Sequence, residues 1–269
     1  MATIASLPLA VSARPQHSTC PIDTKSKHAP RTQRGAFSFV RYGEGLEAAS
    51  GDLCDVVSIG RDRVAVLVAD VAGHGAGAAA IAQVVRDIWR STLRSAMFVK
   101  PAAVLTSMNR ALCALEALDS RFVAATCAIV DSRRQSIAFA RAGAPYPIHR
   151  RFYGDRQLLR PRGMALGVDP LATFETRRLA METGDAFYLV TDGVEPLLTA
   201  QAEGHFVPET GDVERTLAPD ELVANSRWFA ELARHDAHTA LAGLAQRRRA
   251  CLASGLLIDD VTALAIQAR

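Results

Sequence analysis

Short runs of β-branched and aromatic residues, bounded by Gly, Asp or Arg, recur along the chain and are typical of β-strands. Seven runs have this character: FSFVRY (37–42), LCDVVSI (53–59), RVAVLVAD (63–70), FVAATCAIVD (122–131), QSIAFARAG (135–143), DAFYLVTD (185–192) and DVTALAI (260–266). They predict a domain with at least seven strands.

Helical periodicity occupies the intervals between these runs. The stretch 76–98 is rich in alanine with apolar residues at three-to-four spacing, and 101–118 opens with a proline, which the first helical position tolerates. Two more helices are predicted near 218–234 and 237–253. This order of strands and helix pairs is not the alternation of a parallel sheet, so it predicts an α+β fold of antiparallel sheets covered by helix pairs.

Composition separates a leader from the domain. Residues 1–34 are rich in Pro, Ser, Thr, His and Lys and predict a disordered leader before a domain at 35–269. Such a leader is too short for a sensor domain. No Lys or Arg precedes its apolar run, whereas a signal peptide carries positive charge at that place. No stretch reaches the ~20 apolar residues that span a bilayer, so we expect a cytoplasmic protein that does not act at a membrane.

Charge and cysteines exclude several classes of function. A net charge of +3, dispersed along the chain, does not predict nucleic acid binding, and QRRRA (246–250) is expected to be the solvated end of a helix. The five cysteines form no CxxC pair, which argues against a zinc knuckle or a disulfide framework. RRFYGDRQLLRPRG (150–163) predicts an exposed hairpin edge protected by charge, or a docking surface for an acidic partner.

Aspartates at the edges of strand-like runs are the candidate chemistry. They are Asp52 in SGDLCD, Asp70 in VADVAGHG, Asp192 in LVTDGVE and Asp259 in IDDVTAL. One alone is typical of a helix cap or a turn. If the strand ends meet, however, the like charges repel or take up protons, and divalent cations resolve the conflict. Oxygen ligands favour Mg²⁺ or Mn²⁺ over zinc, and two such ions bridged by Asp70 can orient a water for attack on a phosphoryl group.

Several of these segments occur together in one known family. SGDLCDVV, VAVLVADVAGHGAGAAAIA, MALGVDP, GDAFYLVTDGVEP and DDVTALAI have the order and approximate spacing seen there. The chain resembles the metal-dependent protein serine/threonine phosphatases of the protein phosphatase 2C superfamily over about residues 38 to 267. It is most similar to the bacterial sporulation and stress-response branch, typified by stage II sporulation protein E.

The resemblance implies a four-layer αββα sandwich with two Mn²⁺ or Mg²⁺ ions at one end. Asp70 would bridge both ions, and the carbonyl of Val71 would contact one of them. Asp192 and Asp259 would complete the coordination of the other ion. Asp52 would hold a metal-bound water or the second ion. The implied reaction is hydrolysis of phosphoserine or phosphothreonine on a phosphorylated protein that resembles an anti-sigma-factor antagonist.

Some positions leave alternatives open. Asp55 could replace Asp52 as a ligand, and Asp260 could replace Asp259. His74 could hydrogen-bond the phosphate or donate a proton to the leaving serine oxygen, or it could merely close its loop.

Two positions bear on substrate binding. Relatives often have a histidine where this chain has Ala144, which brings any substrate contact of that histidine into question. Arg41 stands roughly where eukaryotic members have a phosphate-binding arginine. The alternatives to a protein phosphatase are a catalytically inactive module of the same fold that sequesters a phosphoprotein and a hydrolase of small phosphoesters.

Overall fold

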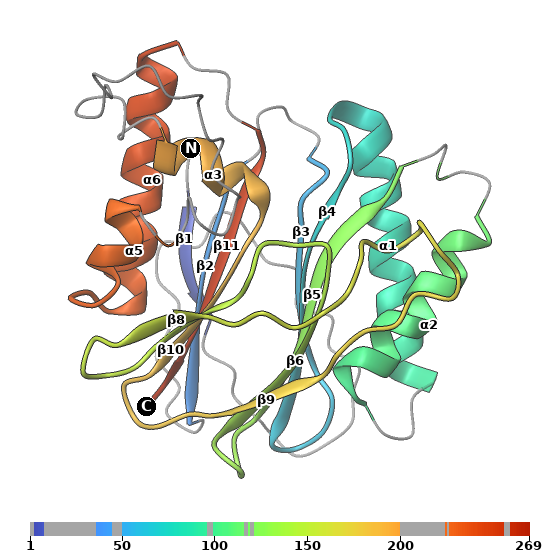
Figure 1. Cartoon of the computed structure of the whole chain (residues 1–269), viewed down its shortest axis with the longest axis horizontal. Coiled ribbons are helices and arrows are strands. Elements are labelled where there is room, and N and C mark those ends of the chain that lie inside the picture. The colour runs from blue at the N-terminus through green and yellow to red at the C-terminus, as the bar shows by residue number, and fades with distance from the viewer. Residues whose placement is uncertain are drawn as a thin grey trace, which may run out of the picture.

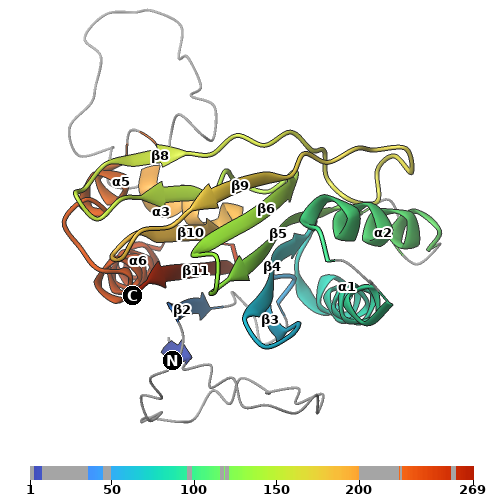
Figure 2. The same ribbon diagram turned by 90° about the horizontal axis from the view of Figure 1, so that it is seen from below.

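The computed structural model describes residues 3–7, 36–44, 50–95, 99–115, 118, 121–199, 224, 226–255 and 259–269. Two β-sheets lie face to face, and helices cover the outer face of each (Figures 1 and 2). The predicted α+β sandwich of four layers, αββα, is therefore the observed fold.

Each sheet is antiparallel throughout. The six-stranded sheet has the order β1 (Thr3–Leu7), β2 (Phe37–Glu44), β11 (Val261–Ala268), β10 (Ala186–Val190), β7 (Ile148–Arg150) and β8 (Arg156–Leu158). The five-stranded sheet has the order β3 (Leu53–Ser58), β4 (Arg63–Val71), β5 (Val123–Asp131), β6 (Ser136–Ala142) and β9 (Arg177–Ala180). The seven predicted runs correspond to β2, β3, β4, β5, β6, β10 and β11.

The helices lie in two groups on opposite sides of the sheets (Figure 2). Beside the five-stranded sheet are α1 (Gly75–Ser95) and α2 (Pro101–Cys113). Beside the six-stranded sheet are a short 3-10 turn (Asp192–Val194), α3 (Glu195–Thr199), α5 (Arg227–Glu231) and α6 (Ala237–Ala253). The helix predicted over 218–234 is seen only in part, since 200–223 and 225 lie outside the described residues.

Three apolar cores separate the four layers. One lies between the sheets, where the rings of Phe139 and Phe187 are 5.1 Å apart. Trp89 of α1 belongs to the core under the five-stranded sheet, and Trp228 of α5 belongs to the core under the other. Because β4 has a core on both faces, six successive residues, 64–69, are buried, and the end of this strand is a rigid support.

The structure differs from the sequence expectation at the N-terminus. Thr3–Leu7 forms a strand paired with β2, within the segment 1–34 that we expected to be mostly disordered; residues 8–35 lie outside the described residues. The physical reason is the free edge of β2, whose backbone groups can pair with a short β-branched segment. The hairpin of β7 and β8 agrees with the expected charged edge, since β8 is the last strand of its sheet.

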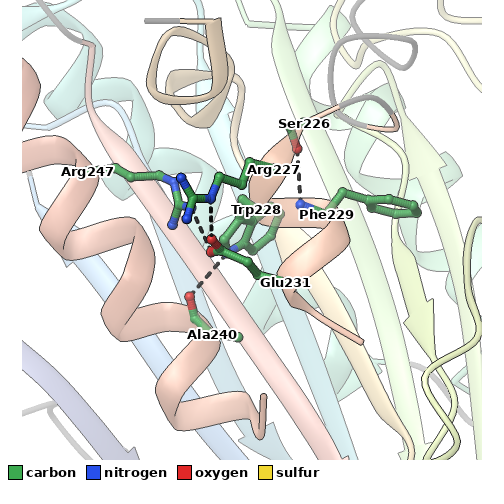
Figure 3. Close-up of polar contacts among 7 residues, drawn as sticks. All are labelled: Ser226, Arg227, Trp228, Phe229, Glu231, Ala240 and Arg247. Atoms are coloured by element: carbon green, nitrogen blue, oxygen red, sulfur yellow. Dashed lines mark hydrogen bonds and ion pairs between the residues drawn. The ribbon is translucent and has the colours of Figure 1, made fainter. Parts of the chain in front are cut away.

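The basic cluster near the C-terminus is not solvated as expected. Arg247 and Arg248 are 8% and 1% exposed, because this turn of α6 packs on the sheet and α5. Arg247 Nη2 donates to Glu231 Oε2 at 2.7 Å, and Arg227 contacts the same carboxylate (Figure 3). The periodicity of the helix predicted its existence but not which arginines it buries.

None of the helices in the described ranges is long and apolar enough to cross a membrane.

We expect Trp228→Ala to lower the free energy of unfolding by about 3–5 kcal/mol, because the ring is buried and leaves a cavity. The substitution also removes the indole N–H that donates to the Ala240 carbonyl at 3.1 Å (Figure 3). Urea denaturation followed by circular dichroism measures the change. Arg227→Ala is the control, since its side chain is 80% exposed and the change should stay within about 0.5 kcal/mol. Equal effects would contradict the assigned core.

Candidate metal centre at one end of the sandwich

The predicted aspartates converge at the end of the sandwich that is uppermost in Figure 1, where β10 runs into α3. In the five-stranded sheet, Leu53 pairs with Ala69, so Asp52 and Asp70 stand at the same end. In the other sheet, Asp192 follows β10 and Asp259 precedes β11, which runs antiparallel to β10. Two sheets thus contribute two carboxylates each.

Hydrogen bonds join the two sheets at this end. The hydroxyl of Thr191 donates to Asp52 Oδ2 at 2.9 Å, and the Thr262 N–H donates to Thr191 Oγ1 at 2.9 Å. The Gly51 N–H donates to Asp260 Oδ2 at 3.0 Å. The contacts of Thr191 with Asp52 and of Gly51 with Asp260 join the two sheets beneath the carboxylates, whereas the contact of Thr262 with Thr191 lies within the six-stranded sheet.

Glycine permits the close approach of these segments at two positions. A Cβ at Gly51 would lie 3.0 Å from the Val71 carbonyl oxygen and 3.5 Å from Asp70 Oδ1. A Cβ at Gly193 would lie 1.9 Å from the carbonyl oxygen of Asp260, which is a clash with backbone. Side chains at these positions would push apart the predicted ligands, so both glycines belong to the site.

The carboxylates strongly perturb one another. Burial, followed by the negative charges of Asp52, Asp192, Asp259 and Asp260, raises the pKa of Asp70 to about 8. Burial also raises the pKa of Asp52 to about 7, although hydrogen bonds from Thr262 and Thr191 act in the opposite direction. In the absence of a cation, these groups therefore hold protons at neutral pH.

The same electrostatic effect reaches two further carboxylates. The pKa of Asp192 is raised by burial and by the charge of Asp259. Glu195, in the first turn of α3, has its pKa raised to about 7 by burial and by the charge of Asp192. The cluster of negative charge is thus larger than the four aspartates that the sequence indicated.

One buried oxygen has no partner. Asp52 Oδ1 is inaccessible to solvent and makes no hydrogen bond, whereas Oδ2 is bound by Thr191. An orphaned carboxylate oxygen beside other carboxylates is suited to a cation or a cation-bound water. Within the part of the chain that the structure describes, no group of three Asp, Glu, His or Cys side chains is close enough together to hold a metal ion directly.

The remaining predicted residues lie on the same loop or at its rim. Val71 ends β4, and its carbonyl oxygen is close to Gly51. His74 is exposed in the loop between β4 and α1. Asp192 and Asp259 are exposed, in contrast to Asp52 and Asp70, which are half-buried. The structure thus brings the predicted aspartates together, whereas their roles as ligands stay predictions.

The two alternative aspartates have other partners. Asp55 is buried and accepts two hydrogen bonds from Arg90 of α1, at 2.9 and 3.0 Å. Asp260 is buried and accepts from the Gly51 N–H. Asp259 accepts from the Asp260 N–H at 2.8 Å but is otherwise exposed. These contacts favour Asp52 and Asp259 as the residues available to a metal.

The structure also shows the surroundings of Ala144 and Arg41, the two positions that bear on substrate binding. Ala144 is buried, and its carbonyl accepts a hydrogen bond from Arg141, whose guanidinium stacks on Tyr146 at 4.4 Å. Arg41 lies along β2, with Nη2 3.2 Å from where a Cβ on Gly43 would stand.

Residues that the sequence reasoning did not assign complete the site. They are Gly51, Thr191, Gly193, Glu195 and Thr262. Thr191 and Thr262 stand next to or near predicted aspartates in TDGVE and DDVT, which was the only local signal for them.

Comparisons with known proteins agree with this architecture. A family model described as stage II sporulation protein E (SpoIIE) matches residues 60–269. The phosphoserine phosphatase RsbP of Bacillus subtilis (strain 168) is 26% identical over 148 residues, which are 54% of this chain and 36% of RsbP. The chain therefore spans about a third of the length of that curated relative.

Two solved structures show the same fold. The RsbU and RsbW domains of Rv1364c from Mycobacterium tuberculosis superpose with a TM-score of 0.66 at 22% identity, covering 87% of this chain and 62% of that one. RsbX in complex with magnesium superposes with a TM-score of 0.60 at 15% identity, covering 87% of this chain and 96% of that one. At these identities the likeness supports the fold.

We expect Asp70→Asn to raise the melting temperature of the metal-free protein at pH 8 and to change it much less at pH 4. Because the pKa of Asp70 is raised from 3.8 to about 8 in the folded state, the folded chain binds more protons than the unfolded chain between these pH values. Stability therefore falls as pH rises through this window. Each kcal/mol of repulsion removed corresponds to about 2–4 °C.

Thermal unfolding in EDTA across this pH range measures the effect. Asp62→Asn serves as the control, since Asp62 is exposed in the turn at the opposite end of β4. If the melting temperature of Asp70→Asn differs from that of the wild type by the same amount at all pH values, the inference that the charge of Asp70 destabilises the metal-free protein is wrong.

Proposed function

Because this chain belongs to the stage II sporulation protein E family, we propose that it is a metal-dependent protein serine/threonine phosphatase. The observation that carries this proposal is the convergence of Asp52, Asp70, Asp192 and Asp259 at one end of the sandwich, where burial and neighbouring carboxylates raise the pKa of the first three. RsbP, the similar protein from Bacillus subtilis, is itself named a phosphoserine phosphatase. The proposed phosphatase domain spans residues 35–269, since β2 is an integral strand of the sandwich.

The donor set fits two divalent cations, Mn²⁺ or Mg²⁺. The unpartnered Asp52 Oδ1 offers a free ligand oxygen, and the repulsion felt by Asp70 is relieved by positive charge. All the candidate ligands are oxygen atoms, which favours hard cations over zinc. The similar fold of RsbX was crystallised in complex with magnesium, which supports the same class of ion here.

Each candidate ligand has a role in this proposal. Asp70 would bridge the two ions, with the Val71 carbonyl on one of them; Asp192 and Asp259 would hold the other, and Asp52 a water or the second ion. When bound, the ions supply Lewis acidity, which acidifies a water molecule and offsets the charge of a phosphoryl group.

The chain's own side chains supply orientation and proton transfer. The Thr191 hydroxyl donates to Asp52 Oδ2, which restrains the carboxylate and leaves Oδ1 without a protein partner. Asp70 is held by the rigid end of β4, which keeps the site from relaxing when charge is added. His74, exposed on the loop that follows, would donate a proton to the leaving serine or threonine oxygen.

The proposed substrate is phosphoserine or phosphothreonine on a small regulatory protein of the anti-sigma-factor antagonist type. Two findings support a partner-switching role: the family match to SpoIIE and the fold shared with a chain that contains RsbU and RsbW domains. The four cysteines that the structure describes are all free, which is compatible with action in a reducing cytoplasm.

We expect the purified protein to hydrolyse p-nitrophenyl phosphate with Mn²⁺ or Mg²⁺ and not with EDTA. Asp70→Asn should lower kcat/KM by more than about 100-fold, because it removes a bridging charge rather than a group that only supports a ligand. Asp62→Asn, at the far end of the same strand, should keep wild-type turnover.

The outcomes separate the candidate functions. Full activity in Asp70→Asn would refute its role as the bridge. No turnover with any metal, from protein shown to be folded, would favour a module that sequesters a phosphoprotein. A preference for the small ester over phosphorylated protein would favour a hydrolase of small phosphoesters.

We expect the affinity for Mn²⁺ to increase at least tenfold between pH 6 and pH 8.5. Asp52 and Asp70 have pKa values of about 7 and about 8 without metal, so cations compete with protons below these values. Isothermal titration calorimetry in two buffers of different ionisation enthalpy measures both the affinity and the protons released. An affinity that is independent of pH, without proton release, would contradict the proposal that these two carboxylates bind the ions.

A further inference from the structure

Arg121 stands beside the loop that follows Asp70, although no motif in the sequence indicated it. It lies two residues before the start of β5, the neighbour of β4 in the five-stranded sheet. The Ala72 N–H donates to the Phe122 carbonyl at 2.9 Å, so pairing between these strands continues past the end of β4. The loop that follows Asp70 is therefore adjacent to Arg121.

The side chain of Arg121 lies against two glycines, Gly73 in this loop and Gly77 in α1. A Cβ built on Gly73 would lie 3.6 Å from Arg121 Nε, and one built on Gly77 would lie 3.0 Å from Nη1 and 3.3 Å from Nη2. The guanidinium thus lies against the first turn of α1. Glycine is a poor residue inside a helix, and here the missing side chain leaves room for the guanidinium.

Within the described part of the chain, the structure shows no acceptor for the guanidinium of Arg121. Among the residues that the structure describes, no carboxylate or carbonyl accepts a hydrogen bond from the half-buried Arg121 side chain. Arg90 of α1 binds Asp55, and Arg141 of β6 donates to backbone carbonyls, so these two arginines near the five-stranded sheet are paired. The first turn of α1 contains no acidic residue that could pair with Arg121.

The position of the Arg121 guanidinium suits the binding of a phosphomonoester. A phosphomonoester dianion approaches an end of the molecule that carries several carboxylates, and a fixed positive charge at the rim offsets their repulsion. The planar fork of a guanidinium matches two oxygens of a phosphate, and such bonds are stronger than neutral ones.

We propose that Arg121 binds the phosphoryl group of the substrate, with Gly73 and Gly77 providing the surface that holds its guanidinium in place. The assignment rests on the proposed phosphatase function and concerns the phosphoserine or phosphothreonine monoester and the inorganic phosphate released from it. Arg121 is thus a substrate-binding residue contributed by the strand next to the one that carries Asp70.

The test compares Arg121→Ala and Arg121→Lys with the wild type, using inorganic phosphate as the probe. Calorimetric titration of the Mn²⁺-loaded protein with phosphate gives its dissociation constant, and inhibition of p-nitrophenyl phosphate hydrolysis gives Ki. Loss of a charge-assisted pair should weaken both by about 10- to 100-fold in Arg121→Ala. Arg121→Lys should be intermediate, because the charge remains without the fork.

A matched control removes the same charge elsewhere. Arg133 is exposed in the turn after β5, at the opposite end of that strand, and Arg133→Ala should leave phosphate affinity unchanged. Binding of Mn²⁺ should be the same in all of these variants, because Arg121 is not a ligand. This readout separates a substrate contact from damage to the metal centre.

A second variant distinguishes substrate binding from a structural role. Gly77→Ala improves helix propensity but places a methyl group against Nη1, which moves the guanidinium by a few tenths of an ångström. We expect phosphate affinity to fall about threefold without a decrease in melting temperature. In the Arg121→Ala background, Gly77→Ala should have no further effect on phosphate affinity, since the displaced group is absent.

The outcomes separate this assignment from the proposed function. If the wild type binds phosphate more tightly than Arg121→Ala but shows no turnover, the phosphatase proposal fails and the role of Arg121 stands. Equal phosphate affinity in wild type and Arg121→Ala, or no phosphate binding by either, overturns the assignment. A loss of melting temperature in Arg121→Ala with unchanged phosphate affinity would show that the residue is structural.

Discussion

Repulsion among carboxylates at one end of the sandwich is the constraint on which the site depends. The pKa of Asp70 is raised to about 8 and that of Asp52 to about 7, largely by burial and by the charges of neighbouring aspartates. Such an arrangement costs stability unless protons or cations neutralise it. It persists because packing elsewhere in the domain holds the strand ends together.

The two sheets provide that support in different ways. β4 is buried on both faces and holds Asp70 at a rigid end. The six-stranded sheet contributes Asp192 and Asp259, and the contacts of Thr191 with Asp52 and of Gly51 with Asp260 tie it to the other sheet. A site built between two sheets has a geometry that depends on the core between them, so substitutions in that core would alter the ligand positions as well as the stability.

Much of the fold followed from local pattern. The seven strand-like runs and the helices over 76–98 and 237–253 were predicted because each has a strong apolar period. The four-residue β9 was not predicted, because a segment this short has too few positions to show a period, and the three-residue strands β7 and β8 were expected only as a hairpin within 150–163. The buried arginines of α6 were mistaken for a solvated cluster because charge in a sequence does not show which residues a neighbouring helix will cover.

The sequence by itself determined the α+β class, the main strands and the four aspartates at strand edges, since these depend on periodicity and on residues close together in the chain. Only the tertiary structure decided which carboxylates are available, because Arg90, 35 residues away, binds Asp55 and leaves Asp52 to the site. It also decided that Asp52 Oδ1 is buried without a hydrogen-bond partner and that Arg121 lies against Gly77. These features arise from contacts between distant segments, which no local pattern encodes.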